Sequence, residues 1–282
     1  MKITIAKTIK NYVGGKFVRS ESGRSFAVNQ KNGEFYANLC LSSRKDIRDA
    51  VEAAQAGLQD WSARSAFNRS QILYRMAEMT EGKRTEFVQL LELTLGLSSD
   101  KANQEVDQAI DSFVYYAGFC DKFIQLASSV NPINGPFSNV SFPEPTGVTC
   151  LVTEREFSLG RIAAQISAIL CGGNSVIVVL EEESDCPAII APLSEVFATS
   201  DLPNGVVNLI NASGKEVLEV MASHMDVRAF SMQNKDMGMI KRLQELSTEN
   251  LKRVILPREN HHSLDAILDT VEIKTIWQPM GF

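Results

Sequence analysis

The sequence is poor in the residues that build metal, redox and nucleic-acid sites. Of its 282 residues only three are histidine and five are cysteine. The adjacent His261 and His262 lack ligand spacing and a third partner, so we predict no metal site. Acidic residues outnumber basic ones, 34 against 28, and the net charge of −6 argues against a nucleic-acid or anionic-membrane partner.

Long apolar runs and paired cysteines are also missing. No apolar run approaches the roughly 18 residues needed to cross a bilayer, and the N-terminus MKITIAKTIKNYVGGK lacks the apolar region of a signal peptide. We therefore expect a cytoplasmic protein without a membrane partner. No C-x-x-C pair occurs, and in that compartment the cysteines should be reduced and mostly buried. They are Cys40, Cys120, Cys150, Cys171 and Cys186.

What is present supports a folded core with a helical first half. The chain is 44% hydrophobic and 22% charged. The stretch NYVGGKFV sets two short apolar runs around Gly14 and Gly15, which predicts a hairpin. Ser43 and Asp46 form a short-armed capping box, after which helical patterns continue to about Leu126. Residues 128–147, SSVNPINGPFSNVSFPEPTG, are rich in Pro, Gly, Ser and Asn and predict an extended arm or linker.

The second half alternates short apolar strands with helices. Strands are predicted over residues 148–152, 175–180, 206–210, 227–230 and 251–256, with helices between them. Parallel neighbours require such crossovers. We predict an α/β fold: a doubly wound, five-stranded parallel Rossmann-like sheet with an N-terminal helical segment and an extended β arm. The predicted boundaries are 1–127 for the hairpin and helices, 128–147 for the arm, 148–260 for the sheet and 261–282 for a C-terminal strand.

The turn after the first of these strands carries an unusual charge pattern. In nucleotide-binding folds this turn faces a ligand, commonly an anion. Here it reads Glu154-Arg155-Glu156. Three interpretations stay open: a solvated loop with an internal ion pair, an ionic contact to a partner, and an unrecognised ligand site.

The order of several motifs resembles the aldehyde dehydrogenase family. EPTGV, CGGNSVIVV, LPNGVVNLI, SHMDVRAFS and NLKRVIL follow that family's coenzyme domain in order and spacing, and NYVGGKFV, NRSQILYRMAE and EVDQAIDSFVYYAG resemble its N-terminal segments. Enzymes of the family oxidise aldehydes with NAD or NADP. They use a cysteine nucleophile, an asparagine that stabilises the oxyanion and a glutamate base.

The resemblance places other residue types on these catalytic positions. The oxyanion asparagine falls on Glu156, whose ionised carboxylate can only accept hydrogen bonds. The glutamate base falls on Pro257, which has no titratable group. Past Pro257 the resemblance skips the catalytic domain and resumes at HHSLDAILDTVEIKTIWQPMGF, and none of the cysteines lies in a segment that resembles the nucleophile's. We therefore predict no catalytic residues.

The cofactor positions are similarly altered. The residues that the resemblance places near the cofactor are Thr153, Glu182, Ser231, Gln233 and Gly238. The family's ribose-binding lysine becomes Val179, and Met232 replaces a glycine of the pyrophosphate turn, where bulk hinders close approach of a phosphate. We expect NAD or NADP to bind weakly at best.

The tail TVEIKTIW alternates like a strand, with Val271, Ile273, Thr275 and Trp277 on one face. In the resembling family this strand joins the extended arm and docks on the catalytic-domain sheet of a neighbouring subunit. Our leading hypothesis is a non-catalytic protein that associates with itself and with a full-length aldehyde dehydrogenase, as a regulatory or scaffold subunit. Three alternatives stay open: an ordinary edge strand covering its own domain, a nucleotide- or metabolite-binding module, and a residual NAD(P)-dependent oxidoreductase.

Overall fold

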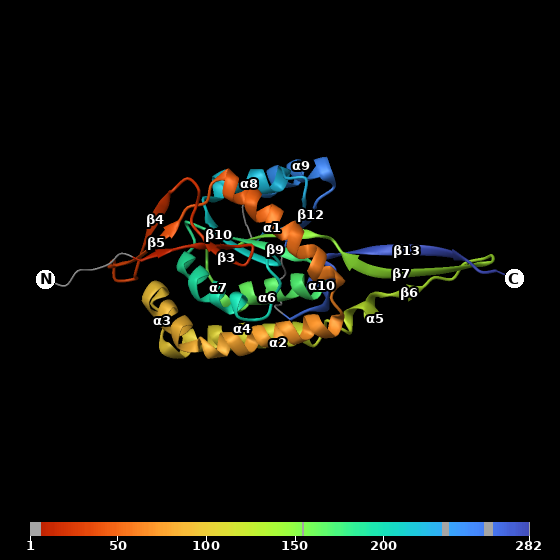
Figure 1. Cartoon of the computed structure of the whole chain (residues 1–282), viewed down its shortest axis with the longest axis horizontal. Helices are drawn as coiled ribbons and strands as arrows, with labels where there is room; N and C mark the ends of the chain where they lie inside the picture. Colours follow the sequence, from red (N-terminus) through yellow and green to blue (C-terminus); the bar gives the residue numbers. More distant parts are fainter. Residues whose placement is uncertain (1–6, 154, 233–236, 257–261, 282) are drawn as a thin grey trace.

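A computed structural model, which describes residues 7–153, 155–232, 237–256 and 262–281, contains a mixed seven-stranded sheet (Figure 1). In spatial order its strands are β12 (Arg253–Ile255), β11 (Val227–Met232), β8 (Val148–Val152), β9 (Ser175–Glu181), β10 (Val207–Ala212), β2 (Asn11–Val13) and β3 (Lys16–Val18). Strands β12, β11, β8, β9 and β10 run parallel to one another. Strand β2 is antiparallel to β10, and β3 is antiparallel to β2.

The α/β class is confirmed, and the five predicted strands pair parallel, but the sheet that contains them has seven strands rather than five. The hairpin around Gly14 and Gly15, both at positive φ, joins the sheet beside β10. Its attachment depends on side-chain amides: the Gly14 N–H donates to Asn208 Oδ1 at 2.9 Å, and the Asn211 N–H donates to Asn11 Oδ1 at 3.2 Å. These contacts join segments about two hundred residues apart, which local periodicity does not reveal.

Helices cover both faces of the sheet. Alternate strand residues face opposite ways, so Ile177 and Val179 pack with α1 (Arg44–Ala63), α8 (Gly214–Ser223) and α9 (Met237–Ser247). Val176 and Val178 face α6 (Leu159–Cys171) and α7 (Ile190–Ala198). Helices α2 (Ala66–Gly82), α3 (Arg84–Leu95) and α4 (Ser99–Ala117) form a further layer beyond α6 (Figure 1). None of the helices in the described ranges is both long and apolar enough to span a membrane.

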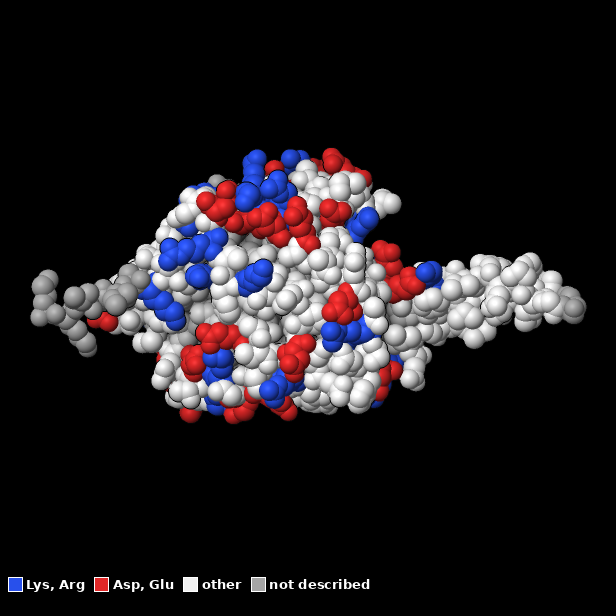
Figure 2. Space-filling view, viewed as in Figure 1, with Lys and Arg blue, Asp and Glu red and all other residues white. Residues whose placement is uncertain are grey.

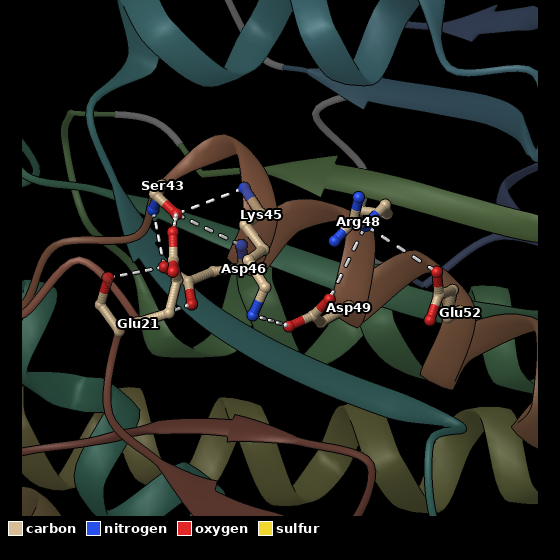
Figure 3. A network of polar contacts seen from close by, with 8 residues as sticks. Glu21, Ser43, Lys45, Asp46, Arg48, Asp49 and Glu52 are labelled. Atoms are coloured by element: carbon tan, nitrogen blue, oxygen red, sulfur yellow. Dashed lines mark hydrogen bonds and ion pairs between the residues drawn. The ribbon is translucent and has the colours of Figure 1, made fainter.

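The capping box predicted at Ser43 begins α1 (Figure 3). The Ser43 hydroxyl accepts from the Asp46 N–H, and Asp46 Oδ2 accepts from the Ser43 N–H at 2.7 Å. Asp46 is only 8% exposed, and its carboxylate also accepts from the Ser20 hydroxyl and the Glu21 N–H. A buried carboxylate with these donors satisfies the helix start and ties the preceding loop to α1.

Two smaller sheets flank the body. At the N-terminal end, β1 (Thr8–Ile9), β5 (Phe35–Cys40) and β4 (Ser25–Asn29) form one of them. The other is the arm, which we define as β6 (Ser129–Val130), β7 (Phe137–Pro145) and β13 (Val271–Pro279). The arm projects from the body, and the short helices α5 (Phe123–Ala127) and α10 (Leu264–Leu268) lie near its base (Figure 1). The 3₁₀ turns η1 (Pro187–Ile189) and η2 (Thr248–Asn250) precede α7 and β12 respectively.

Candidate functional site

The strand order creates a switch point between β8 and β11. The chain passes from β8 through β9 to β10 on one side, then crosses to β11 on the other side of β8. Doubly wound folds bind ligands outside the carboxyl ends of the strands at such a point. The candidate site therefore comprises the residues after β8, from Thr153 to Ser158, together with those at the end of β11.

Of the five predicted cofactor residues, Thr153, Ser231 and Gly238 lie around this point. Thr153 follows β8 and is 5% exposed; both its N–H and its hydroxyl donate to the Val179 carbonyl, at 3.0 and 3.2 Å. Ser231 is buried within β11, whereas Gly238 is exposed at the start of α9. Glu182 follows β9, further along the sheet, and is half-buried. Gln233 lies outside the described residues.

The charged turn after β8 lies at the surface. Arg155 and Glu156 are exposed, and the Arg155 carbonyl accepts from the Asp185 N–H at 2.9 Å. The turn therefore rests on the loop that follows β9. A cleft beside it has a volume of about 10 Å³, room for roughly one water molecule. It is lined by Thr153, Glu156, Phe157, Ser158, Arg161, Ile162 and Gln165. Glu154 and Pro257 lie outside the described residues.

A carboxylate from another helix occupies the start of α6. Glu105, on α4, accepts from the Ser158 hydroxyl at 3.0 Å and from the Gly160 N–H at 3.2 Å. Helix α4 approaches closely here, because a Cβ added at Gly160 would lie 2.6 Å from the Gln108 Cβ. A helix N-terminus attracts anions through its free N–H groups and its dipole. In this chain Glu105 already meets that demand.

A second carboxylate lies at the start of α8. A Cβ added at Gly214, the first residue of α8, would lie 2.4 Å from Glu181 Oε1. Burial, together with the nearby Glu183 and Glu182, raises the pKa of Glu181. This corner at the carboxyl end of β9 therefore combines three carboxyl groups in consecutive positions.

These features do not fit a bound dinucleotide. The turn that the resemblance aligns with the family's pyrophosphate turn ends β11 ahead of α9; Met232 there is buried, and residues 233–236 lie outside the described residues. At the same end of the sheet, the carboxylates at the starts of α6 and α8 oppose an anion at those two helix starts. The ribose-binding lysine of the resembling family is replaced by Val179, which is fully buried under α1 and α8. We therefore assign no cofactor step to this edge of the sheet.

The cysteines do not supply a nucleophile either. All five are buried. Burial raises the pKa of Cys150 and of Cys186 to about 12, and it raises that of Cys171 as well. A catalytic cysteine needs an accessible thiolate, which an electropositive environment favours. The five thiols of this chain are instead buried, and burial disfavours the thiolate.

The predicted association residues lie on the arm. Strand β13 pairs antiparallel with β7 along its full length, from Val271 opposite Pro145 to Pro279 opposite Phe137. Ile273 and Trp277 are 57% and 61% exposed, whereas Val271 at the base is buried. The Thr275 hydroxyl contacts that of Ser141 at 2.8 Å.

Charged residues lie only near the base of the arm. Lys274 Nζ lies 2.8 Å from Glu144 Oε1, and Glu272 is next along β13. Beyond this pair neither β7 nor β13 carries a charged side chain, so the tip forms an uncharged extension of the body (Figure 2). The arm differs from the candidate site at the ends of β8 and β11, because the backbone and side chains of the arm are accessible.

The missed residue of this site is Glu105. It belongs to a helix 53 residues before Ser158, and one acidic residue among many on a helix gives no signal for such a contact. The helix start itself was readable, because Ser158 precedes the apolar pattern of α6 and serves as its N-cap. The sequence did not show that the carboxylate of Glu105 accepts hydrogen bonds from the Ser158 hydroxyl and the Gly160 N–H at this helix start.

Comparisons with known proteins identify a common sequence family. The sequence profile of the aldehyde dehydrogenase family matches residues 17–262. The malonate-semialdehyde dehydrogenase of Bacillus pumilus is 27% identical over 286 residues, which cover 100% of this chain and 58% of that protein. The D-glyceraldehyde dehydrogenase (NADP(+)) of Thermoplasma acidophilum is 27% identical over 252 residues, covering 88% of this chain and 49% of that protein.

Solved structures give the same result. The NAD+ complex of an aldehyde dehydrogenase from Bacillus cereus superposes with a TM-score of 0.79 at 25% identity, over 89% of this chain and 50% of that one. PnpE from Pseudomonas sp. WBC-3 gives a TM-score of 0.80 at 26% identity over the same shares. The chain thus spans about half the length of the relatives that it matches.

Proposed function

Because the chain belongs to the aldehyde dehydrogenase family, we propose that it is a non-catalytic member that acts by association through its arm. Its partner in this proposal is a full-length aldehyde dehydrogenase, which it serves as a regulatory or scaffold subunit. The observation that carries the proposal is the arm itself. A nine-residue strand, β13, is held in place by β7 while its side chains beyond Val271 stay exposed.

The first support comes from the missing chemistry. Aldehyde oxidation by a cysteine enzyme requires a thiolate, an oxyanion donor and a held cofactor. The thiols here are buried, and Glu156 is an exposed side chain that accepts hydrogen bonds when ionised. Carboxylates at the starts of α6 and α8 oppose a dinucleotide.

The second support comes from the connection between the body and the arm. In the resembling family the catalytic domain lies between the last strand of the coenzyme sheet and the arm strand. Here β12 ends at Ile255 and α10 begins at Leu264, so a short connection replaces that domain. The chain thus combines the arm with a body from which the arm's usual docking surface is absent.

The third support is the physical character of β13. An edge strand presents unpaired N–H and C=O groups, which makes it a template for another strand. Affinity in such strand addition comes from main-chain hydrogen bonds, and specificity comes from pockets for alternate side chains. Ile273, Thr275 and Trp277 would fill those pockets on the partner.

The experiment is a native affinity purification from the source cells. The chain carries a tag at its N-terminus; the sheet that holds β4 and β5, the first part of the chain that the structure describes, lies at the opposite end of the molecule from the arm (Figure 1). We expect mass spectrometry of the eluate to identify a full-length aldehyde dehydrogenase in stoichiometric amount. An Ile273→Lys, Trp277→Lys double variant should lose it, because two ammonium groups would have to be desolvated in an apolar contact.

A variant of another exposed apolar residue serves as the matched control. Phe67, on α2, is 69% exposed and lies on the body, so Phe67→Lys should retain the partner. Recovery of only this chain would sink the heteromeric proposal. The non-catalytic part has its own assay: aldehyde-dependent NADH or NADPH formation by the pure chain would contradict it.

A further inference from the structure

The pairing register shows which backbone groups of β13 face outward. In an antiparallel ladder the hydrogen-bonded pairs alternate with non-hydrogen-bonded ones. The Met280 N–H donates to the Pro136 carbonyl, and the Thr146 N–H donates to the Thr270 carbonyl, so even-numbered residues of this segment bond toward β7. The N–H and C=O groups of the odd-numbered residues therefore point to the other side.

The outward groups belong to Ile273, Thr275 and Trp277. Strand β13 lies at the end of the arm sheet, in the order β13-β7-β6, with no neighbour beyond it among the described residues. The arm projects clear of the body, so another strand can approach this edge (Figure 1). Pro279, the next odd residue, has no N–H and ends the usable edge.

We propose that in the isolated chain this edge pairs with the same edge of a second copy. This inference rests on the proposal above that the arm is the association surface. The two β13 strands run antiparallel around a twofold axis at Thr275, so that Thr275 lies opposite Thr275 of the second copy. Ile273 then lies opposite Trp277 of the other strand, on each side of the axis. The two arm sheets become one continuous six-stranded sheet.

The sequence of β13 favours this register over its neighbours. With the axis at Thr275, Lys274 lies opposite Ile276 and Glu272 opposite Gln278, so no like charges meet. An axis at Lys274 would set two ammonium groups directly opposite each other, which is destabilising. An axis at Ile276 would place Ile273 opposite Pro279, which cannot donate. An axis at Ile273 would need the outward groups of Val271, which is buried at the base of the arm. Among registers that use only the exposed odd-numbered residues, the axis at Thr275 alone gives three hydrogen-bonded pairs with both donors and no like charges opposite one another.

Self-pairing would regulate the heteromeric function. The same N–H and C=O groups of Ile273, Thr275 and Trp277 cannot serve a second copy and a larger partner at once. In the homodimer these groups of β13 are occupied and cannot bind the larger partner, and dissociation of the homodimer makes them available again. Self-pairing also explains how an accessible apolar strand avoids uncontrolled aggregation.

Charge variants at the axis test the proposal by sedimentation equilibrium of the full chain. Thr275 is exposed, and both variants lose the same contact with Ser141, whose hydroxyl still accepts from Asn131 Nδ2 at 2.8 Å, so the arm should accept either charge. We expect a dimer for the natural chain, and a dissociation constant raised about tenfold by Thr275→Lys or by Thr275→Glu, since each sets like charges opposite one another. Mixing the two variants should restore the dimer. That restoration separates an interface effect from a folding defect.

Gln278→Lys is the matched control, because in this register Gln278 lies opposite Glu272 of the second copy. The added lysine should leave the dimer as tight as before or tighter. A natural chain that stays monomeric at about 100 μM would overturn the proposal, and so would a dimer that both Thr275 variants retain. Neither result bears on capture of a full-length aldehyde dehydrogenase, so the two proposals fail separately.

Cross-linking gives an independent measure of the register. Residues in a hydrogen-bonded antiparallel pair have Cα atoms about 5.5 Å apart, within disulfide range. Under a thiol oxidant Thr275→Cys should form a disulfide-linked dimer, with two thiols losing their protons and two electrons to the oxidant. Gln278→Cys should not, because it faces Glu272. The natural cysteines are all buried, so they give no background. The reverse pattern would refute the register.

Discussion

Lys252 offers a quantitative test of the packing around the start of β12. It is only 7% exposed, and its Nζ donates to the carbonyls of His224 and Val227, at 2.7 and 2.5 Å. Burial lowers the pKa of Lys252 from 10.5 to about 8. The free-energy equivalent is about 3 kcal/mol, from roughly 1.4 kcal/mol per pKa unit.

The sign of the pH dependence follows from proton counting. Below pH 8 both the folded and the unfolded chain keep the Lys252 proton, and above pH 10.5 both have lost it. Between these values the unfolded chain binds one proton more, so this group makes the free energy of unfolding rise with pH. Lys252→Met keeps the apolar stem and removes the titration. In the natural chain Asn250 Nδ2 also donates to the Val227 carbonyl, at 3.1 Å, so we expect that carbonyl to keep a donor in the variant.

The assay is urea unfolding of both proteins across pH 7.5 to 10.5, followed by the fluorescence of the buried Trp61. The natural chain should gain about 3 kcal/mol relative to Lys252→Met over this interval. All other titrating groups are common to the two proteins, so the difference curve isolates Lys252. A difference that is flat with pH, or that falls, would refute the buried environment of this lysine.

Two further predictions concern the candidate site. Glu105→Ala should lower the free energy of unfolding by about 1–2 kcal/mol, because the Ser158 hydroxyl and the Gly160 N–H lose a charged acceptor; Glu105→Gln, which keeps an acceptor oxygen, should lose less, and equal urea midpoints for all three proteins would contradict the contact. A chromogenic disulfide should find no reactive thiol in the folded chain and five in guanidinium, since every cysteine is buried; rapid native labelling of any one would contradict that burial.

Local signals predicted the elements of the fold better than their assembly. Gly14 and Gly15 predicted the hairpin, and Ser43 with Asp46 predicted the start of α1, because positive φ values and helix caps depend on neighbouring residues. The same signals could not place the hairpin beside β10. That contact depends on Asn208, a buried amide in the middle of an apolar strand.

The candidate site shows the same division. Sequence order placed Glu156 on the turn after β8, and that turn is present. The residues that decide what the turn can bind lie elsewhere in the chain. Glu105 comes from α4, and the Glu181 carboxylate lies beside Gly214 at the start of α8. Charge compensation across helices depends on three-dimensional packing, so no spacing rule along the chain reveals it.

The arm survives the short connection from β12 because the joined ends already lie together. Arg253 of β12 donates through Nη1 to the carbonyls of Leu268 and Asp269, at 3.5 and 3.4 Å, at the end of α10. The Thr270 carbonyl accepts hydrogen bonds from Asn174 Nδ2 and from the Thr146 hydroxyl, so β13 is anchored to the body before the arm begins. A domain inserted between neighbouring ends can be absent without moving either one. These contacts hold the start of β13 on the body whatever joins β12 to α10, which is the physical condition that the proposed association through the arm requires.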